Sequence, residues 1–264
     1  MPRLEQTFRT DALIIRRQDY LEADRLLTLM TPAHGKIRAI AKGVRKPAAK
    51  MGGHLELYTR ANLLLRRGRD LHQVTQAECA EPYRAAREHL HWYAYASHLV
   101  ELLDRFSEDD EPNPPLYALL NVALGWLAEP SSDLALITRF YETRLLRLTG
   151  FEPSLFRCAV GGEKITAQDQ FFSVGDGGLV CPDHARGRSL IPLSLNALKL
   201  LRHMQTDDFE AVSRWDLSAA MHATLERVAH TYIAHILESR LKSADFLHLL
   251  QRLETSPSPP PVSP

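Results

Sequence analysis

The stretch that decides the fold is His34-Gly35-Lys36-Ile37-Arg38-Ala39-Ile40-Ala41-Lys42-Gly43-Val44-Arg45. Residues 36–41 alternate polar and apolar side chains, which is the pattern of a half-buried strand. Residues 32–35, Pro-Ala-His-Gly, form a turn signal before this strand, and the basic, glycine-containing residues 43–53 are typical of a loop. The stretch therefore predicts a strand held between a tight turn and a basic loop.

Four more β-type runs surround this strand, at residues 10–16, 26–31, 55–65 and 71–77. Five short strands in about 80 residues predict a small antiparallel barrel, because closure of the sheet removes its exposed edges. The length and strand number match the OB-fold, and small barrels of the SH3 type have similar counts. We assign residues 1–80 to an N-terminal five-stranded barrel of the OB or the SH3 type.

From Glu81 onward the apolar residues recur at helical spacing. Ser131 or Ser132 is a plausible N-cap and Gly150 a plausible C-cap of one of the helices. The helices are expected at residues 83–106, 116–127, 133–149, 192–205 and 216–242. The fold class is therefore α+β, with a helical domain at 81–254 that carries a turn-rich insert at about 151–189. The Ser/Pro-rich residues 255–264 predict a disordered tail.

The overall composition is that of a soluble globular protein, with 45% hydrophobic and 24% charged residues among 264. The longest apolar runs are far too short to cross a membrane. No export signal is visible at the N-terminus, and three cysteines cannot pair without leaving one over. We therefore expect reduced thiols and a cytoplasmic protein.

The formal net charge of zero conceals two halves of opposite sign. Residues 1–80 hold 15 Lys and Arg against 8 Asp and Glu, whereas residues 81–264 hold 17 against 24. This asymmetry predicts two modules with different partners, and it indicates that the basic module binds a polyanion. The alternative is an electrostatic clamp between the halves, in which the basic face is masked by the protein itself.

Clustered cations in the predicted barrel are the candidate DNA contacts, because such groups neutralise phosphates and release counterions. Only three aromatic residues, Phe8, Tyr20 and Tyr58, are present there as platforms for base stacking. Backbone contacts are therefore favoured over stacking, and duplex binding stays open. The candidate residues are Arg16, Arg17, Lys36, Arg38, Lys42, Arg45, Lys46, Arg66 and Arg67.

Two cysteine-containing turns in the insert are spaced as in a zinc ribbon. A structural zinc site uses paired Cys or His ligands on two turns. Cys158, Cys181 and His184 occupy three of the four ligand positions, and the fourth is Gly161, which cannot bind a metal. The insert is thus either a three-ligand zinc-ribbon-like site or a degenerate ribbon held by packing. Residues 171–173 and 177–179 could pair across it.

No catalytic constellation is apparent: phosphate loops, nucleophile elbows and His-Glu-x2-His motifs are all missing from the sequence. We therefore predict a protein that is not an enzyme. Arg139 and Arg144 lie on one helix face and could offer a cationic site for an acidic peptide. The alternative is that these arginines simply face solvent.

These parts, in this order, resemble the RecO family of bacterial recombination mediators. Residues 12–17 and 24–31 are similar to its first two strands, residues 34–45 to its third strand and basic loop, and residues 144–153, followed by Cys158, to the helix before its zinc module. The chain differs at Gly161 and His184, where many members have cysteine.

The resemblance implies that the barrel at residues 1–80 is an OB-fold. It also implies a DNA repair and recombination protein that binds single- and double-stranded DNA and anneals complementary strands. It implies partnership with RecR and with the C-terminal tail of the single-stranded-DNA-binding protein SSB, and indirectly with RecA, whose loading it assists on the nucleoid. It carries Lys36, Arg38, Lys42 and Arg45 over as DNA contacts, and Arg139 and Arg144 as the tail site. A transcription- or RNA-associated adaptor on the same barrel, and a zinc hydrolase or nuclease, are the alternatives.

Overall fold

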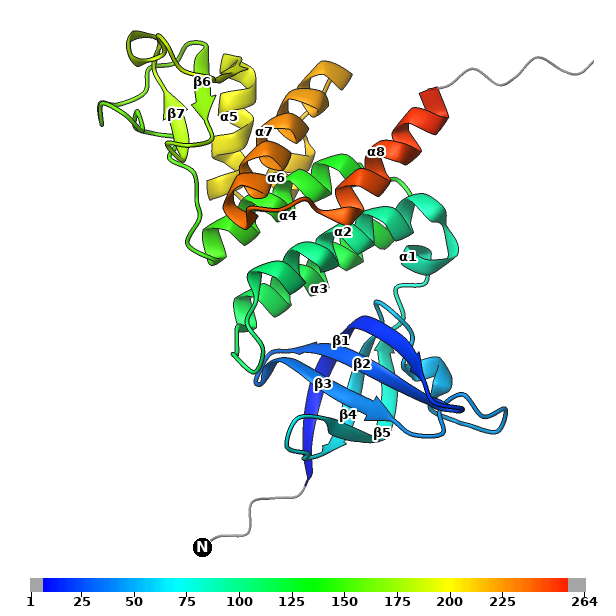
Figure 1. Ribbon diagram of the computed structural model, residues 1–264. Helices are drawn as coiled ribbons and strands as arrows, with labels where there is room; N and C mark the ends of the chain where they lie inside the picture. Colours follow the sequence, from blue (N-terminus) through cyan, green and yellow to red (C-terminus); the bar gives the residue numbers. More distant parts are fainter. Residues whose placement is uncertain (1–6, 256–264) are drawn as a thin grey trace, which may run out of the picture.

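The computed structural model describes residues 7–255, which form a β-barrel, a helical domain and a small second sheet (Figure 1). The barrel lies at one end of the molecule and the small sheet at the other, with the helices between them (Figure 1). The chain is thus a mixed α+β protein, as predicted.

Five strands close the barrel in the order β1-β2-β3-β5-β4, and β1 and β4 pair to complete it. All neighbouring strands are antiparallel except β3 and β5. The side chains alternate as the sequence predicts: on β3, Ile37, Ala39 and Ala41 are buried inside the barrel. The strands are β1 (Thr7–Tyr20), β2 (Asp24–Thr31), β3 (Gly35–Ala41), β4 (Arg60–Arg66) and β5 (His72–Glu81).

The fourth strand is shorter than the prediction of residues 55–65. It begins only at Arg60, after a 3-10 turn, η1 (Gly52–His54), and a left-handed residue, Tyr58, with φ 64°. The Tyr58 ring is buried against the helices, and its hydroxyl lies 2.7 Å from Ser97 Oγ. This segment is therefore shaped by its contact with the helical domain, which a local strand pattern does not reveal.

The helical domain contains more breaks than the sequence pattern predicts. The helix expected at 83–106 is split, because His89 is extended (φ −123°, ψ 131°). The helix expected at 216–242 ends at Leu237, where Glu238 is left-handed, and a further helix follows that was not predicted. The helices are α1 (Ala85–Glu88), α2 (Leu90–Phe106), α3 (Pro114–Ala128), α4 (Leu134–Leu148), α5 (Leu195–Thr206), α6 (Phe209–Ser213), α7 (Ala219–Leu237) and α8 (Lys242–Thr255).

The two ends of α4 test the capping predictions. Its N-cap is Asp133, whose carboxylate accepts a hydrogen bond from Leu136 N at 2.9 Å, so the prediction of Ser131 or Ser132 was wrong. Ser132 instead donates its hydroxyl to the Trp126 carbonyl. Gly150 adopts φ +82° just after the helix, which confirms its predicted role in ending α4.

The insert is a small three-stranded sheet in the order β7-β6-β8. The predicted pairing is present, since Phe172 faces Leu179 and Ser173 faces Gly178. The third strand, β8, lies just beyond the predicted insert. The elements are β6 (Gln170–Ser173), β7 (Gly178–Val180), the 3-10 turn η2 (Pro182–His184) and β8 (Ile191–Leu193).

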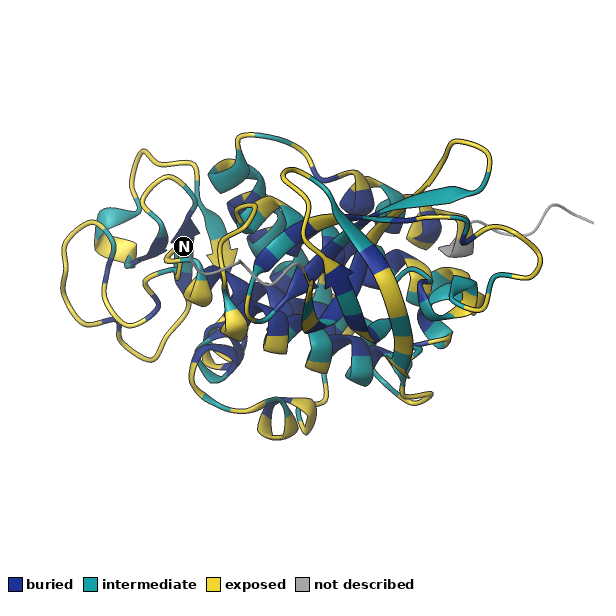
Figure 2. Cartoon of the chain, turned by 90° about the horizontal axis from the view of Figure 1, so that it is seen from below, coloured by how far each residue is buried: buried dark blue, intermediate teal, exposed yellow. Residues whose placement is uncertain are grey.

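One large hydrophobic core joins the three parts. It contains outward-facing barrel residues such as Leu13 and Met30, the buried faces of the helices, and Phe172 of the small sheet. A second cluster fills the barrel interior. Figure 2 shows buried positions concentrated in the central helices and exposed ones in the peripheral loops. Within residues 7–255, no helix combines the length and apolar character needed to cross a membrane. The tail predicted at 255–264 lies, from residue 256 on, outside the described residues.

Candidate nucleic-acid interface and cysteine cluster

Two connections meet at one end of the barrel, the β1–β2 turn at 21–23 and the β3–β4 connection at 42–59. The Arg45 amide donates to the Ala23 carbonyl at 2.9 Å, and the Gly43 amide donates to Asp24 Oδ1 at 2.7 Å. Gly43 has φ +63°, which turns the chain sharply after β3. These contacts hold in place a group of exposed cations that we call the basic loop end: Lys42, Arg45, Lys46 and Lys50.

The members of the basic loop end differ in whether their charged groups form ion pairs. Arg45 lies 3.3 Å from Asp19 Oδ2 and also reaches the carbonyls of Leu21 and Glu22. Lys42, Lys46 and Lys50 form no ion pair with any residue in the range 7–255. Three unpaired ammonium groups on one loop are therefore available to an external anion.

The outer face of β1–β3 carries a second group of predicted contacts. Arg16 and Arg38 both face Thr28 across neighbouring strands, and they line a hollow of about 300 Å³. Arg16 is bound to Asp104 of α2 at 2.6 Å, whereas Arg38 is exposed and has no ion pair within the described chain. Nearer the loop end, Arg17 pairs with Glu56. Only Arg38 of this face thus offers an uncommitted charge.

Lys36 has a different role from the one predicted. Its ammonium lies 3.1 Å from Asp104 Oδ1 and 3.2 Å from Asp109 Oδ1, and it donates to the carbonyls of Asp104 and Ser107. Its side chain is only 11% exposed. Lys36 therefore ties the barrel to the helical domain, and we do not count it among the DNA contacts.

This role gives the first testable prediction. The Lys36→Met substitution is expected to lower the free energy of unfolding by about 2–3 kcal/mol, because it removes charge-assisted hydrogen bonds in a partly buried site. The salt dependence of DNA binding should stay as in the unmodified protein. Urea denaturation and a salt titration measure the two effects. Lys42→Met is the matched control: it should lower the salt slope of DNA binding and leave the free energy of unfolding unchanged. A lower salt slope for Lys36→Met but not for Lys42→Met would contradict the assignment.

Two predicted DNA contacts, Arg66 and Arg67, lie at the opposite end of the barrel, where Arg67 packs against an aromatic ring. The Arg67 guanidinium lies 4.5 Å from the centre of the Phe8 ring, whose neighbours are His34 and His72. Burial, and in addition the charge of Arg67, lowers the pKa of His34, and burial likewise lowers the pKa of His72. Arg66 is hydrogen-bonded to Gln73. The structure thus separates Arg66 and Arg67 from the basic loop end.

The three aromatic residues of the barrel offer little room for base stacking. Arg67 covers Phe8, and Tyr58 is buried. Tyr20, which is 42% exposed, is the one that stays accessible. This arrangement agrees with contacts to the phosphate backbone more than with stacked bases.

The predicted partner site at Arg139 and Arg144 is not assembled as a surface. Arg139 is 7% exposed and pairs with the buried Glu142 at 3.0 Å. Arg144 donates to the carbonyls of Gln205 and Asp207 at the end of α5, and its desolvation lowers its pKa. Both guanidinium groups are used inside the helical domain, where Arg144 satisfies backbone carbonyls that α5 leaves open.

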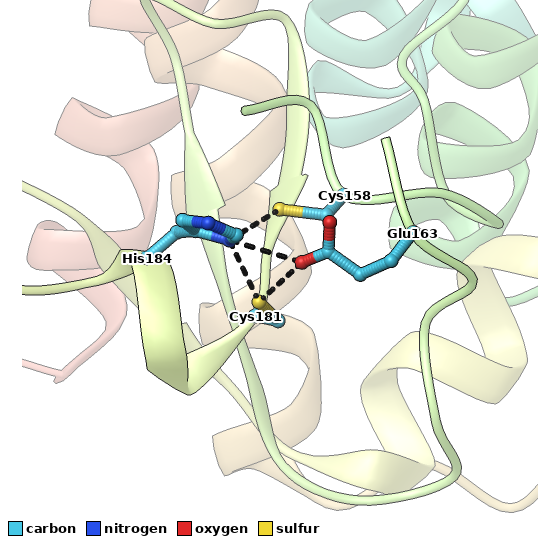
Figure 3. Close-up of side chains that lie close together, drawn as sticks. All are labelled: Cys158, Glu163, Cys181 and His184. Atoms are coloured by element: carbon cyan, nitrogen blue, oxygen red, sulfur yellow. Dashed lines mark hydrogen bonds and ion pairs between the residues drawn. The ribbon is translucent and has the colours of Figure 1, made fainter. Parts of the chain in front are cut away.

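The cysteine cluster brings together the three predicted ligands and a fourth residue that the sequence analysis missed (Figure 3). His184 Nδ1 lies 3.6 Å from Cys158 Sγ and 3.2 Å from Cys181 Sγ. Glu163 Oε1 lies 2.9 Å from both Cys181 Sγ and His184 Nδ1. The hydrogen bond from the Cys181 thiol lowers the pKa of the Glu163 carboxyl to about 2 and raises that of Cys181 to about 11. Cys79 lies apart, on β5.

A signal for Glu163 was present in the sequence. It lies two residues after Gly161, the position that lacks a ligand, and carboxylates are accepted zinc ligands. The Cys-x2-Cys spacing of a zinc ribbon places the fourth ligand at position 161 and not at position 163.

The fold and its charges define a class of protein, a nucleic-acid-binding protein in which a basic barrel is packed on a helical domain. Comparison with known proteins identifies the family. Residues 4–83 match the family described as "Recombination protein O N terminal", and residues 87–245 match "Recombination protein O C terminal". The chain therefore belongs to the RecO family and has a role in DNA repair and recombination.

Individual relatives extend over nearly the whole chain. The "DNA repair protein RecO" of Roseiflexus sp. (strain RS-1) is 38% identical over 260 residues, which are 98% of this chain and 91% of that protein. A protein of the same name from Dehalococcoides mccartyi (strain ATCC BAA-2266 / KCTC 15142 / 195) is 34% identical over 245 residues, or 93% and 96% of the two chains.

Proposed function

We propose that this protein is a recombination mediator that works by binding rather than by catalysis. It binds single- and double-stranded DNA through an OB-fold barrel, anneals complementary strands, and helps to load RecA onto SSB-coated single strands. The observation that carries the proposal is the basic loop end, where Lys42, Lys46 and Lys50 are exposed and have no ion pair in the described chain. Its place of action is the nucleoid in the cytoplasm.

The DNA path follows from the charges that are left free. It runs over the basic loop end and includes Arg38 on the outer face of β3. Asp104 and Asp109 border the hollow beside Arg38, and their negative charges repel phosphates, so the path does not enter this hollow. Ammonium groups that track a backbone bind any sequence, which is what a mediator of repair at arbitrary positions requires. Such contacts also serve both strand forms, since phosphates are common to them.

Annealing fits the same surface. Two complementary strands repel each other through their phosphates, and a cluster of flexible lysines lowers this repulsion while leaving the base edges free to pair. The scarcity of exposed aromatic rings is consistent with this step, because bases stacked on the protein would have to be released before they could pair.

The helical domain is the part of the chain left for the remaining partners. We infer that RecR and the C-terminal tail of SSB bind there, and that RecA is reached through them. Arg139 and Arg144 do not serve the tail, because their guanidinium groups are occupied by internal contacts.

Charge reversal on the basic loop end tests the proposal. The double substitution Lys42→Glu and Lys46→Glu should weaken DNA binding roughly tenfold or more and lower the slope of log K against log salt by about 1.5, since each lost phosphate contact contributes about 0.7–0.9. Fluorescence anisotropy with single- and double-stranded oligonucleotides over a salt series measures both. The same variant should lose the ability to accelerate annealing of complementary strands.

The matched control places the same charge change on the helical domain. Lys199→Glu with Arg227→Glu alters two exposed cations of α5 and α7 that have no ion pair in the described chain. This control should leave the salt slope unchanged. Equal loss in both variants would show that net charge alone matters, and an unmodified protein that does not accelerate annealing would contradict the mediator function.

A further inference from the structure

Two turns of the small sheet module place four potential metal ligands in one cluster. Cys158 and Glu163 belong to a turn closed by hydrogen bonds from Cys158 N to the Glu163 carbonyl (2.8 Å) and from Gly162 N to the Cys158 carbonyl (2.9 Å). Cys181 and His184 flank and end the 3-10 turn η2, which the hydrogen bond from His184 N to the Cys181 carbonyl closes. One ligand atom from each residue lies within 4.8 Å of all the others.

The space beside Gly161 is occupied by the side chains of Glu163 and His184. A Cβ atom built on Gly161 would lie 2.1 Å from Glu163 Oε2 and 2.4 Å from His184 Cε1. The volume that a side chain at position 161 would need is therefore filled by the Glu163 carboxylate and the edge of the His184 ring. In Figure 3 the Glu163 side chain extends toward Cys181 and His184, and its carboxylate meets both.

We propose that Glu163 is the fourth ligand of a tetrahedral zinc site completed by Cys158, Cys181 and His184, in which its carboxylate takes the place of a ligand at position 161. This inference goes beyond the DNA-binding function, because the cluster lies in the small sheet module and not in the barrel.

The chemistry of the four donors selects zinc. Two thiolates, one imidazole and one carboxylate form a mixed N/S/O set that a borderline-soft ion such as Zn²⁺ accepts in tetrahedral geometry. Bond lengths of about 2.0–2.3 Å place tetrahedral ligand atoms about 3.3–3.8 Å apart. The four separations given above, 2.9 to 3.6 Å, need only small outward movements of the ligand atoms to reach this range.

The environment of the cluster defines what the metal would do. Cys158 is 2% exposed and belongs to the main hydrophobic core, whereas the Glu163 and His184 side chains are 44% and 40% exposed. The ion would therefore fasten the exposed turn η2 to the core through Cys158. A carboxylate on the solvent side makes the site weaker and more exchangeable than one with a third thiolate, because thiolates are the softer and stronger ligands for zinc.

Substitution of the glutamate, alone and with a compensating cysteine, tests the assignment. The unmodified full-length protein should bind equimolar zinc, measured by elemental analysis after dialysis and by competition with a zinc-binding dye. Glu163→Gln, which keeps the shape of the side chain, should weaken zinc binding by at least about tenfold to a hundredfold, the loss typical when only a hydrogen-bond partner of a metal ligand is changed. Glu129→Gln, at an exposed position of the helical domain, is the matched control and should bind zinc as the unmodified protein does.

The compensating variant combines Gly161→Cys with Glu163→Ala. Gly161 is not left-handed, so cysteine can be accommodated once the carboxylate is gone and the edge of the His184 ring has moved aside. Zinc binding should recover to at least the original affinity. With Co²⁺ as probe, the sulfur-to-metal charge-transfer absorption should rise by about half, from two thiolates to three.

Three results would overturn the proposal. They are absence of stoichiometric zinc in the unmodified protein, undiminished zinc affinity in Glu163→Gln, and a Co²⁺ spectrum of Glu163→Gln identical to that of the unmodified protein. If the double variant does not fold, the isosteric Glu163→Gln variant alone decides the question. DNA binding by these variants is measured separately, so failure of the zinc proposal is distinguishable from failure of the mediator function.

Discussion

Substitution of Arg139 by methionine is expected to lower the free energy of unfolding by about 3–5 kcal/mol, because it leaves a buried carboxylate without its cation. The carboxylate is Glu142, which is 1% exposed and whose Oε1 lies 3.0 Å from Arg139 Nη2 and 2.8 Å from His98 Nε2. His98 Nδ1 in turn lies 2.9 Å from Ser243 Oγ on α8. The loss should therefore extend to the packing of the C-terminal helix.

A second variant isolates the charge from the packing. Arg139→Met combined with Glu142→Gln keeps a hydrogen-bonding group beside His98 and removes the buried negative charge, so it should recover at least about half of the lost stability. Urea denaturation followed by far-ultraviolet circular dichroism measures both variants. A loss below about 1 kcal/mol for Arg139→Met, or no recovery in the double variant, would show that the ion pair is not what stabilises this part of the core.

Substitution of Gly35 by alanine is the second large effect, expected to cost about 2–4 kcal/mol. Gly35 has φ +66°, which costs an L-residue about 1 kcal/mol or more. An alanine Cβ would also lie 2.1 Å from the carbonyl oxygen of Glu111, an atom of the backbone that cannot move aside cheaply. This clash adds about 1–3 kcal/mol. The clash lies where the β2–β3 turn contacts the α2–α3 connection, next to the contacts of Lys36.

Gly43→Ala is the matched control for this prediction. Gly43 has a similar φ of +63°, but a Cβ there would meet only side-chain carbons of Lys46, at 3.8 Å. The control should therefore show the conformational cost alone, about 1 kcal/mol. Thermal and urea denaturation of the two variants give the comparison. Equal losses would mean that the close approach of the Glu111 backbone to Gly35 adds no cost to the substitution.

The local patterns of the sequence predicted most elements of the fold. The alternation in residues 36–41 and the helical spacing in residues 133–149 appear in the structure as β3 and α4, because periods of 2.0 and 3.6 are properties of the chain itself. The unpredicted helix α8 shows the limit of this reasoning. Glu238 breaks the preceding helix with φ 50°, and neither glycine nor proline marks the position.

The sequence identified which residues carry the charges and the potential metal ligands, but not which of these side chains are exposed and which bind internal partners. Lys42 and Lys46 are exposed and have no ion pair in the described chain. Lys36, Arg139 and Arg144 are equally basic in the sequence, but their side chains bind internal partners. Cys158, Cys181 and His184 do come together, and Glu163 joins them through a turn whose shape no ligand spacing foretold.

The sequence by itself therefore determined most strands, most helices and the charge asymmetry of this member of the RecO family, since each depends on neighbours along the chain. Only the tertiary structure decided which charges are free. The acceptors of the Lys36 ammonium lie 68 and 71 residues away in sequence, and those of Arg144 lie 61 and 63 residues away. A cation that is desolvated beside such partners cannot serve a ligand, and its desolvation depends on packing between distant segments.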